Sequence, residues 1–270
     1  MPCPDPDVVR AEYARSDSLR VRLDTHRLYS ERQDDLDQRC RVLMGLSGGE
    51  SLLDVGPGPG RFEAHLRAAG HRGLLVGIDA SPGMAAEAAG SVSSAKWAVG
   101  DAQALPVRSG YFDWAAARHM LYHVPDIPAA LRELRRAIRR DGAVLVTTNG
   151  AESLPVLRGL RREAGEAFGL PAPGGGAGGS FSTATAPELL GAAFPHVEEM
   201  VCENALRFAD AAPAVRYVES TFTLGGVGED AELRAALRAW LLCAVGRAVA
   251  AGGGVLRDPK YVAFYVARTA

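Results

Sequence analysis

The sequence has few cysteines and no long apolar run, and these shortages exclude several classes of protein. Its four cysteines lie far apart and form no C-x-x-C pair, so neither a disulfide framework nor a zinc knuckle is expected. No apolar stretch approaches the ~20 residues that a helix needs to cross a bilayer. The first residues, MPCPDPDVVR, lack the basic and apolar regions of a signal peptide. The sequence therefore predicts a cytoplasmic protein that does not associate with a membrane.

Positive charge is not in excess either. The 30 basic and 32 acidic side chains give a net charge of -2, whereas proteins that bind nucleic acid usually carry a basic surplus that replaces phosphate counterions. The densest basic run is the group of arginines between residues 132 and 140. We interpret it as the wet face of an amphipathic helix that buries Leu131, Leu134 and Ile138. The expected partner is a small molecule and not a nucleic acid, with the chain as a monomer or a homodimer.

From residue 51 onward, short apolar runs alternate with segments of helical spacing. The runs are SLLDV, GLLVGID, AKWAVGD, YFDWAAA and AVLVTT, and a helix is expected over residues 127–142, ended by Gly142. This alternation is typical of parallel strands joined by βαβ crossovers, and apolar strands indicate a sheet covered on both faces. Ligands of such sheets bind at the carboxyl ends of the strands, where the strand order reverses.

The pattern divides the chain into four parts. Residues 1–47 are polar and amphipathic and predict an N-terminal helical cap, and residues 48–150 predict an α/β core. Residues 151–195 predict a lid or substrate insertion, and residues 196–270 predict the completion of the sheet, with strands at 196–208 and 260–268. The glycine-rich segment 171–180 inside the insertion is typical of either a flexible connection or the hinge of a lid.

The stretch LLDVGPGPGRF holds three glycines, Gly56, Gly58 and Gly60, at every second position directly after a strand. Glycine permits positive φ and lets a ligand lie against bare backbone, and the following helix offers free N–H groups. Dinucleotide binding instead prefers G-x-G-x-x-G, and Arg61 stands where that pattern has its third glycine. Asp54, two residues before the turn, can receive an ammonium group or brace the turn.

Two acidic residues follow the next two strands. Asp79 ends the second strand, nineteen residues after Gly60, where a carboxylate can accept both hydroxyls of a ribose. An acidic residue at a solvated strand end is the alternative interpretation. Asp101 follows the third strand and can accept from an adenine amino group, while its small neighbour Ala102 leaves room for the ring. A turn-forming aspartate is the alternative there.

Together these segments resemble a known family. LLDVGPGPG, GID, GDAQALPV, YFDWAAARHMLYHVPD and LRELRRAIRRDGAVLVTT follow the ordered motifs of class I S-adenosylmethionine-dependent methyltransferases, most closely the small-molecule enzymes of the ubiquinone/menaquinone C-methyltransferase type. The resemblance covers residues 50–150. It implies S-adenosyl-L-methionine as the cofactor and a doubly wound, Rossmann-like α/β sheet of seven strands with the last strand antiparallel.

The resemblance also implies a role for individual residues. Asp54 and the three turn glycines would hold the methionine part of the cofactor, and Asp79 would hold its ribose. Ala80 and Met84 would flank the adenine, Asp101 and Ala102 would meet its edge, and Arg118 or His119 would lie beside the sulfonium. Pro57 and Pro59 stand where the family usually has Cys or Gly and Thr or Ser, a tolerable departure because the backbone shape matters most there.

The N-terminal segment of related enzymes caps the cofactor and supplies aromatic or arginine contacts to its carboxylate. By this analogy, Tyr29 and Arg32 are the candidates in this chain. The alternative is that the segment is an amphipathic helix packed on the sheet.

Methyl transfer needs a base only when the acceptor carries a proton of high pKa. The candidates are His119 and His123, because histidine changes charge near neutral pH. The alternative for His123 is a packed residue at a helix start. The two histidines also have the i, i+4 spacing of a metal site, but Pro125 disfavours a helix there and no third ligand is evident, so no metal is expected.

The sequence therefore predicts an enzyme that transfers a methyl group from S-adenosylmethionine to O, N or C of a small molecule, such as a secondary metabolite in a biosynthetic reaction. The alternatives are a non-methylating reaction with the same cofactor, such as an intramolecular cyclisation, an RNA methyltransferase, and a non-catalytic cofactor-binding partner. The chain lacks a basic appended domain and the N-P-P-Y motif of RNA enzymes, with ARHM in its place.

Overall fold

A seven-stranded sheet forms the centre of the computed structural model, which describes residues 5–170, 179–228 and 230–269. The strands are β1 (Leu52–Val55), β2 (Leu75–Asp79), β3 (Lys96–Val99), β4 (Phe112–Arg118), β5 (Ile138–Asn149), β6 (His196–Phe208) and β7 (Leu256–Arg268). Their order is β3-β2-β1-β4-β5-β7-β6. β1 to β5 pair in parallel, and β7 is antiparallel to both β5 and β6. The predicted sheet with an antiparallel last strand is confirmed.

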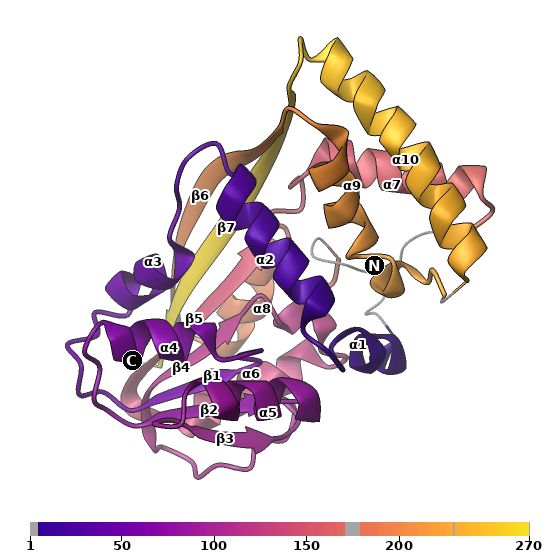
Figure 1. The fold of residues 1–270 in the computed structure, drawn as a ribbon. Coiled ribbons are helices and arrows are strands. Elements are labelled where there is room, and N and C mark those ends of the chain that lie inside the picture. Colours follow the sequence, from indigo (N-terminus) through magenta and orange to yellow (C-terminus); the bar gives the residue numbers. More distant parts are fainter. Residues whose placement is uncertain (1–4, 171–178, 229, 270) are drawn as a thin grey trace.

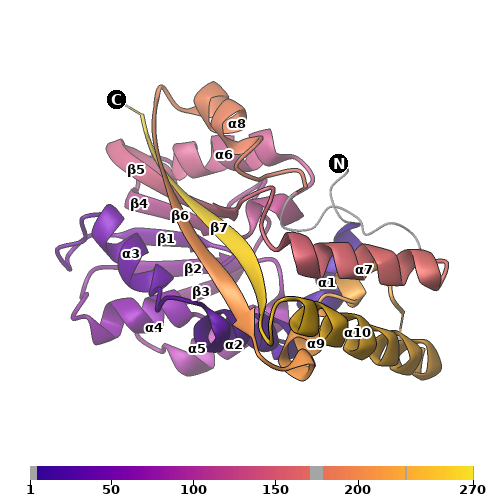
Figure 2. The same ribbon diagram turned by 90° about the horizontal axis from the view of Figure 1, so that it is seen from above.

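Helices cover both faces of this sheet. They are α1 (Pro6–Glu12), α2 (Asp17–Tyr29), α3 (Leu36–Leu43), α4 (Arg61–Ala68), α5 (Pro82–Ser91), α6 (Ile127–Ala137), α7 (Pro155–Ala167), α8 (Ala186–Ala193), α9 (Ala211–Glu219) and α10 (Ala231–Ala251), with short 3-10 turns η1 (Leu121–His123) and η2 (Thr223–Gly225). Figure 2 shows α3, α4 and α5 on one face and α6 and α8 on the other. The expected double winding is therefore present.

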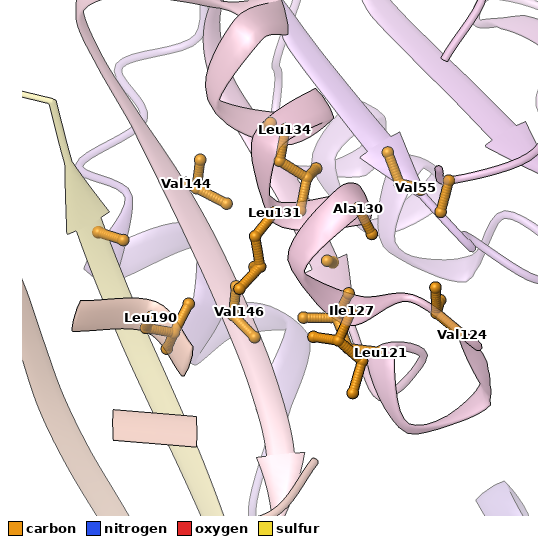
Figure 3. Packing of buried hydrophobic residues seen from close by; sticks show 14 of the residues in the cluster. Val55, Leu121, Val124, Ile127, Ala130, Leu131, Leu134, Val144, Val146 and Leu190 are labelled. Carbon is orange, nitrogen blue, oxygen red and sulfur yellow. The ribbon is translucent and has the colours of Figure 1, made fainter. Parts of the chain in front are cut away.

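The larger core lies between the sheet and α6. The apolar stripe of α6 points Ile127, Leu131 and Leu134 at Val144 and Val146 of β5, and all five side chains are buried (Figure 3). Burial of side chains of this size typically stabilises a fold by about 1.5–3 kcal/mol each. The amphipathic interpretation of the arginine run is correct, because Leu131 and Leu134 carry the buried face.

The expected helix over residues 127–142 is wrong in its second part. α6 ends at Ala137, and Ile138 to Gly142 already belong to β5. Ile138 is buried and pairs with Phe112 of β4, before a register shift in the β4–β5 ladder. Burial of a β-branched side chain in the core and pairing with β4 override the helical periodicity of this stretch.

A second group of helices, α7, α9 and α10, packs at one end of the paired strands β6 and β7 rather than on a face of the sheet (Figure 1). Its own apolar core includes Leu157, Val215, Val218, Leu237 and Leu241. The N-terminal helices meet this group, with α1 against η2 and α2 against α9. The expected hinge or connection at 171–180 lies mostly outside the described residues. None of the described helices combines the length and hydropathy needed to cross a membrane.

Candidate functional site

The strand order reverses between β2 and β4, on the two sides of β1, and the carboxyl ends of these strands meet there. The Gly56 amide donates to the carbonyl of Ile78 at 2.8 Å, and the Gly100 amide donates to the carbonyl of Asp79 at 3.0 Å. On the other side, Val55 pairs with Ala117 of β4. The parallel register therefore brings the glycine turn, Asp79 and the end of β4 to one edge of the sheet.

The glycine turn between β1 and α4 requires glycine at all three positions. Gly56, Gly58 and Gly60 have φ of 69°, 61° and 79°, in the left-handed region that L side chains rarely adopt. Gly60 is also the N-cap of α4, so free N–H groups of the first helical turn lie beside the turn. The result is a cradle of bare backbone with donor groups at its end.

Asp79 is fixed by backbone donors at the end of β2. Its Oδ2 accepts from the Gly58 amide at 3.0 Å and its Oδ1 accepts from the Ser81 amide at 2.8 Å. Burial raises the pKa of this carboxyl. A carboxylate has about four acceptor positions, so two remain for hydroxyl groups. Ser81 caps α5, as its sequence position predicts, and accepts from the Met84 amide at 3.2 Å.

The residues expected around an adenine ring stand next to Asp79. Met84 and Ala102 are buried, whereas Ala80 and Asp101 are exposed. Asp101 accepts from the Gln103 backbone amide at 2.8 Å and from its side-chain amide at 3.0 Å. The turn-forming role considered for Asp101 is therefore present in the structure, and its exposed side chain is also open to a ligand.

Asp54 and Arg118 are bound to each other. The Arg118 Nη2 donates to Asp54 Oδ2 at 3.0 Å, and its Nη1 donates to Asp37 of α3 at 2.9 Å. The guanidinium also lies 4.1 Å from the centre of the Phe62 ring. Burial opposes the charge of Arg118, but Asp54 and Asp37 outweigh it and raise the pKa of the guanidinium. Both side chains brace the turn, so neither is free to reach a ligand in this arrangement.

Glu63 also belongs to this buried group, and its role could not be predicted from the sequence. Its two carboxylate oxygens and Asp54 Oδ1 are buried without a hydrogen-bond partner among the described residues. Burial, and then the nearby Asp54 charge, raise the pKa of Glu63 well above its usual range. A proton on Glu63 lets it donate to Asp54 and removes a buried charge. In the sequence, Glu63 is only an acidic residue in the first turn of a helix, where acids are common.

The two candidate histidines lie just past β4 in different environments. His119 has a φ of 53°, uncommon for a side-chain-bearing residue, and its amide donates to the Thr147 carbonyl at 3.0 Å. Burial, then Arg118, lowers the pKa of His119 to about 4. His123 lies in η1, and burial, then Arg22, lowers its pKa to about 3. Both imidazoles are therefore neutral near pH 7.

The N-terminal segment reaches the site through Tyr13. Its hydroxyl lies 2.9 Å from His123 Nε2, and its carbonyl accepts from Ser81 Oγ at 2.7 Å. Leu19 of α2 lies over the turn, where a Cβ on Gly58 would be 3.5 Å from its Cδ2. Tyr13 therefore links the cap to both the Asp79 side and the His123 side of the site.

The structure does not bring Tyr29 and Arg32 to this edge. The Tyr29 ring packs 5.1 Å from Phe208, and the Arg32 amide donates to the Asn204 side chain at 3.1 Å. Both partners belong to β6, the edge strand four places away from β1 in the sheet. Both residues fit the alternative interpretation, in which the N-terminal segment packs on the sheet. The sequence periodicity of this segment could not predict these contacts, because it indicates the buried face of a helix but not the strand that this face covers.

No metal site is found within the described ranges, which contain no group of three or more His, Cys, Asp or Glu side chains placed to hold an ion. His119 and His123 do not share a helix, because only His123 lies in the short turn η1. Their i, i+4 spacing therefore does not produce the helical geometry of a metal pair.

Comparison with known proteins identifies the central part of the chain. Residues 53–146 match the family model described as a methyltransferase domain. The demethylmenaquinone methyltransferase of Staphylococcus aureus strain JH9 is 34% identical over 126 residues, which make up 44% of this chain and 52% of that protein. The same values hold for the protein of strain Newman. The chain thus matches about half the length of these curated relatives.

Solved structures share the fold over more of the chain. The YcgJ protein of Bacillus subtilis has a TM-score of 0.58 at 18% identity and covers 87% of this chain and 98% of its own. The [4+2]-cyclase SpnF has a TM-score of 0.61 at 19% identity and covers 99% and 98%. A phosphoethanolamine N-methyltransferase of Haemonchus contortus has a TM-score of 0.57 at 14% identity and covers 97% and 60%. At these identities the likeness concerns the fold.

Proposed function

We propose that this chain transfers the methyl group of S-adenosylmethionine to an oxygen, nitrogen or carbon atom of a small molecule, since residues 53–146 match a methyltransferase-domain model. The relatives named above are demethylmenaquinone methyltransferases, and they support a small-molecule acceptor. The family match ends before α7, and α7 to α10 lie outside it. The match therefore does not indicate which acceptor molecule this chain methylates. The cytoplasmic location expected from the sequence stays a prediction.

One observation carries the proposal: a bare-backbone cradle and a fixed carboxylate lie side by side at the switch point of the sheet. The cradle of Gly56, Gly58 and Gly60 can take the methionine part of S-adenosylmethionine, and the two unused acceptor positions of Asp79 can take the ribose hydroxyls. Of the residues expected around the adenine, Ala80 and Asp101, which are exposed next to Asp79, are the ones that are open to the ring. The residues of this site fit the cofactor.

Asp54 and Arg118 support the cofactor site without contacting the cofactor directly. Their ion pair, together with Asp37 and Glu63, holds the end of β1 and the start of α4 in the shape that the turn needs. We therefore assign them as positioning residues for the cofactor. An enzyme that works by placing two reactants gains most from such rigidity.

When bound, S-adenosylmethionine supplies an electrophilic methyl group on a sulfonium. The chain must hold the acceptor in line with this methyl, exclude water and remove a proton where the acceptor carries one. Tyr13 and His123 can remove this proton. A proton that passes from the acceptor to the Tyr13 oxygen is balanced by the Tyr13 proton moving to His123 Nε2 over 2.9 Å. With a pKa of about 3, His123 is a weak base, which suits an acceptor that loses its proton readily.

A non-methylating reaction with the same cofactor, such as an intramolecular cyclisation, is the second candidate. It is favoured by one observation, namely that a structure named as a [4+2]-cyclase shares the fold over 99% of this chain, α7 to α10 included. The two candidates use the same cofactor site and differ in the product, so the mass of the product separates them. A methyltransferase adds the mass of one methyl group, and a cyclase leaves the mass unchanged.

The first experiment is a calorimetric titration of the purified protein with S-adenosylmethionine, S-adenosylhomocysteine and NADH in parallel. We expect micromolar binding of the first two and none of NADH, because Arg61 occupies the position of the third dinucleotide glycine. Binding of NADH alone would overturn the proposal. Binding of the two S-adenosyl compounds would then justify a substrate screen that detects methylated products by mass.

A further inference from the structure

The indole ring of Trp97 lies against the backbone of the glycine turn. β3 is a strand of four residues at one edge of the sheet, and its only side chain that is not exposed is the half-buried Trp97. A Cβ on Gly60 would lie 2.9 Å from Trp97 Cη2, and a Cβ on Gly77 of β2 would lie 2.2 Å from Cζ3. Because bonded structures do not tolerate such approaches, the ring occupies the space that side chains at both glycines would need.

The polar end of the same ring is held by α5. Trp97 Nε1 donates to the carbonyl of Val92, the residue that ends this helix, at 3.0 Å. A buried indole N–H usually has such a partner. Ala88 of α5 packs at the same place, since a Cβ on Gly60 would lie 3.1 Å from Ala88 Cβ. The hydrogen bond and the packing together define the orientation of the ring.

Pro57 at the start of the turn packs on the same part of β2. A Cβ on Gly77 would lie 3.2 Å from Pro57 Cγ, so the bare face of Gly77 receives both the proline and the indole of Trp97. We call Gly77 and Trp97 the turn platform. Gly58 lies between the two supported parts of the turn, and its amide donates to Asp79 Oδ2 at 3.0 Å. The platform therefore sets the position of the turn and, through it, a hydrogen bond of the carboxylate.

The Trp97 ring serves the turn rather than an apolar core. Among the described residues, it contributes to none of the three apolar clusters that fill the interior. Pro59 and Gly60 also border an open cleft of about 180 Å³ between α2, α4 and α5, so the turn is not enclosed on every side. Glycines have wide conformational freedom, and packing has to select one shape for them. The ring is well placed to make that selection.

We propose that Trp97 is a positioning residue for the cofactor, which holds the glycine turn and the Asp79 carboxylate beside it in the shape that binds S-adenosylmethionine. This inference rests on the proposed function, which supplies the cofactor. The ring acts through the turn and not on the methyl acceptor. Its removal is therefore expected to change cofactor affinity and the KM for S-adenosylmethionine much more than kcat.

The first test is calorimetry with S-adenosylhomocysteine on variants of Trp97. Trp97→Ala should bind this ligand about tenfold more weakly than the wild type. Trp97→Phe keeps a flat ring and loses the bond to Val92, so it should lose less affinity than the alanine variant. Trp240→Ala, at a half-buried tryptophan of α10, is the matched control and should bind as the wild type does. The melting temperature of each variant, measured in parallel, separates a loss of stability from a loss of affinity.

The second test reaches the platform from β2. In the wild type, the methyl group of Gly77→Ala meets the ring and should displace it, which weakens S-adenosylhomocysteine binding. In Trp97→Ala the ring is absent, so the same methyl group should change the affinity by less than about twofold. Residues in contact are non-additive in this way, whereas independent positions are additive. Equal effects of Gly77→Ala in the two backgrounds would contradict the proposal.

The remaining outcomes separate this proposal from the proposed function. Tight binding by the wild type and equal binding by Trp97→Ala would overturn the positioning role alone, as would a loss of the same size in Trp240→Ala. No binding by the wild type would overturn the proposed function and with it the cofactor role of Trp97. Should Trp97→Ala not fold, Trp97→Leu, which keeps apolar volume without the flat ring, decides the same comparison. With an acceptor from the mass screen, a lowered kcat at an unchanged KM for S-adenosylmethionine would also contradict the proposal.

Discussion

Arg118, at the cofactor edge of the sheet, and Arg161, among the helices α7, α9 and α10, are both largely enclosed, and their surroundings differ. Arg118 has a carboxylate on each side, Asp54 and Asp37, and an aromatic ring above it. Arg161 has no carboxylate partner in the described residues and lies on a glycine. The Arg118 guanidinium at the cofactor end therefore has its counter-charges in the free protein, whereas the Arg161 guanidinium has none within ion-pair distance among the described residues.

The difference has a mechanistic meaning. A cofactor site that serves every turnover benefits from being preformed, because its geometry then costs nothing to assemble. We infer that rigidity in this chain is concentrated at the ion pair of Asp54.

The largest expected effect is on stability at the cofactor end. Arg118→Met should lower the free energy of unfolding by about 3–5 kcal/mol, since it strands Asp54, whose side chain is 1% exposed, beside the buried Glu63. Urea unfolding followed by circular dichroism measures it. Glu63→Gln is the control and should change stability by less than about 1 kcal/mol, because the amide imitates the protonated carboxyl. A loss of equal size in Arg161→Met would break the comparison between the two arginines.

The next largest effect is on turnover, and it is expected at His123, which the N-terminal cap contacts through Tyr13. His123→Ala should lower kcat by about a hundredfold while leaving the affinity for S-adenosylhomocysteine nearly unchanged, because His123 contacts Tyr13 and not the glycine turn. Tyr13→Phe should lower kcat in the same direction. The measurement is steady-state kinetics with an acceptor found in the mass screen, next to calorimetry of the same variants. Full activity of His123→Ala would exclude the histidine as a base.

For Asp79, on the cofactor side, we expect the opposite pattern, in which a substitution affects cofactor affinity more than kcat. Asp79→Ala should weaken S-adenosylmethionine binding by roughly ten- to a hundredfold through loss of the ribose contact. Asp79→Asn, which keeps the size and one acceptor oxygen, should weaken it less. Calorimetry of both variants is the measurement, with the melting temperature of each variant as the control for folding. Unchanged cofactor affinity in Asp79→Ala would remove this residue from the site.

The smallest effect is a pH dependence of stability from a buried histidine of α2. His26 packs on Tyr217 at 5.6 Å, and burial, then Lys260, lowers its pKa to about 3. The unfolded chain therefore binds more protons between pH 6.5 and 3. Stability from neutral His26 is complete above about pH 6.5 and is lost as the pH falls, by up to about 1.4 kcal/mol per pH unit.

The comparison of wild type with His26→Gln isolates this contribution. Urea unfolding at pH 7 and pH 5 should show a smaller loss of stability on acidification for the variant than for the wild type. His196→Gln, at an exposed histidine of β6, should follow the wild type. Parallel losses in all three proteins would show that the His26 environment is hydrated rather than buried.

Much of the cofactor end could be predicted from the sequence, because it depends on neighbours along the chain. The alternation of apolar runs predicts the order of strands and helices, and the left-handed φ of the turn needs glycines at 56, 58 and 60. Asp79 ends its strand, and in a parallel sheet the ends of adjacent strands meet. Local backbone preference and the pairing rules of parallel strands are sufficient there.

The remaining contacts depend on how distant segments pack, and the sequence predicted them less well. Tyr29 and Arg32 are the predicted cofactor contacts of the cap and instead contact β6, whereas Tyr13 of the same cap reaches His123. Helical spacing defines a buried face but not what covers it. Likewise, the run after Ala137 keeps a helical period and becomes β5, because pairing with β4 and burial of Ile138 outweigh a local preference.

The sequence by itself determined the fold class, the glycine cradle and the carboxylate beside it. Only the tertiary structure decided which arginines have partners. Arg22 and Arg161 lie far apart in the chain, and both interact with Glu12 and Tyr217, which come from two further helices. Whether a buried charge is satisfied depends on every group packed around it, and that set is fixed by the packing of helices from opposite ends of the chain.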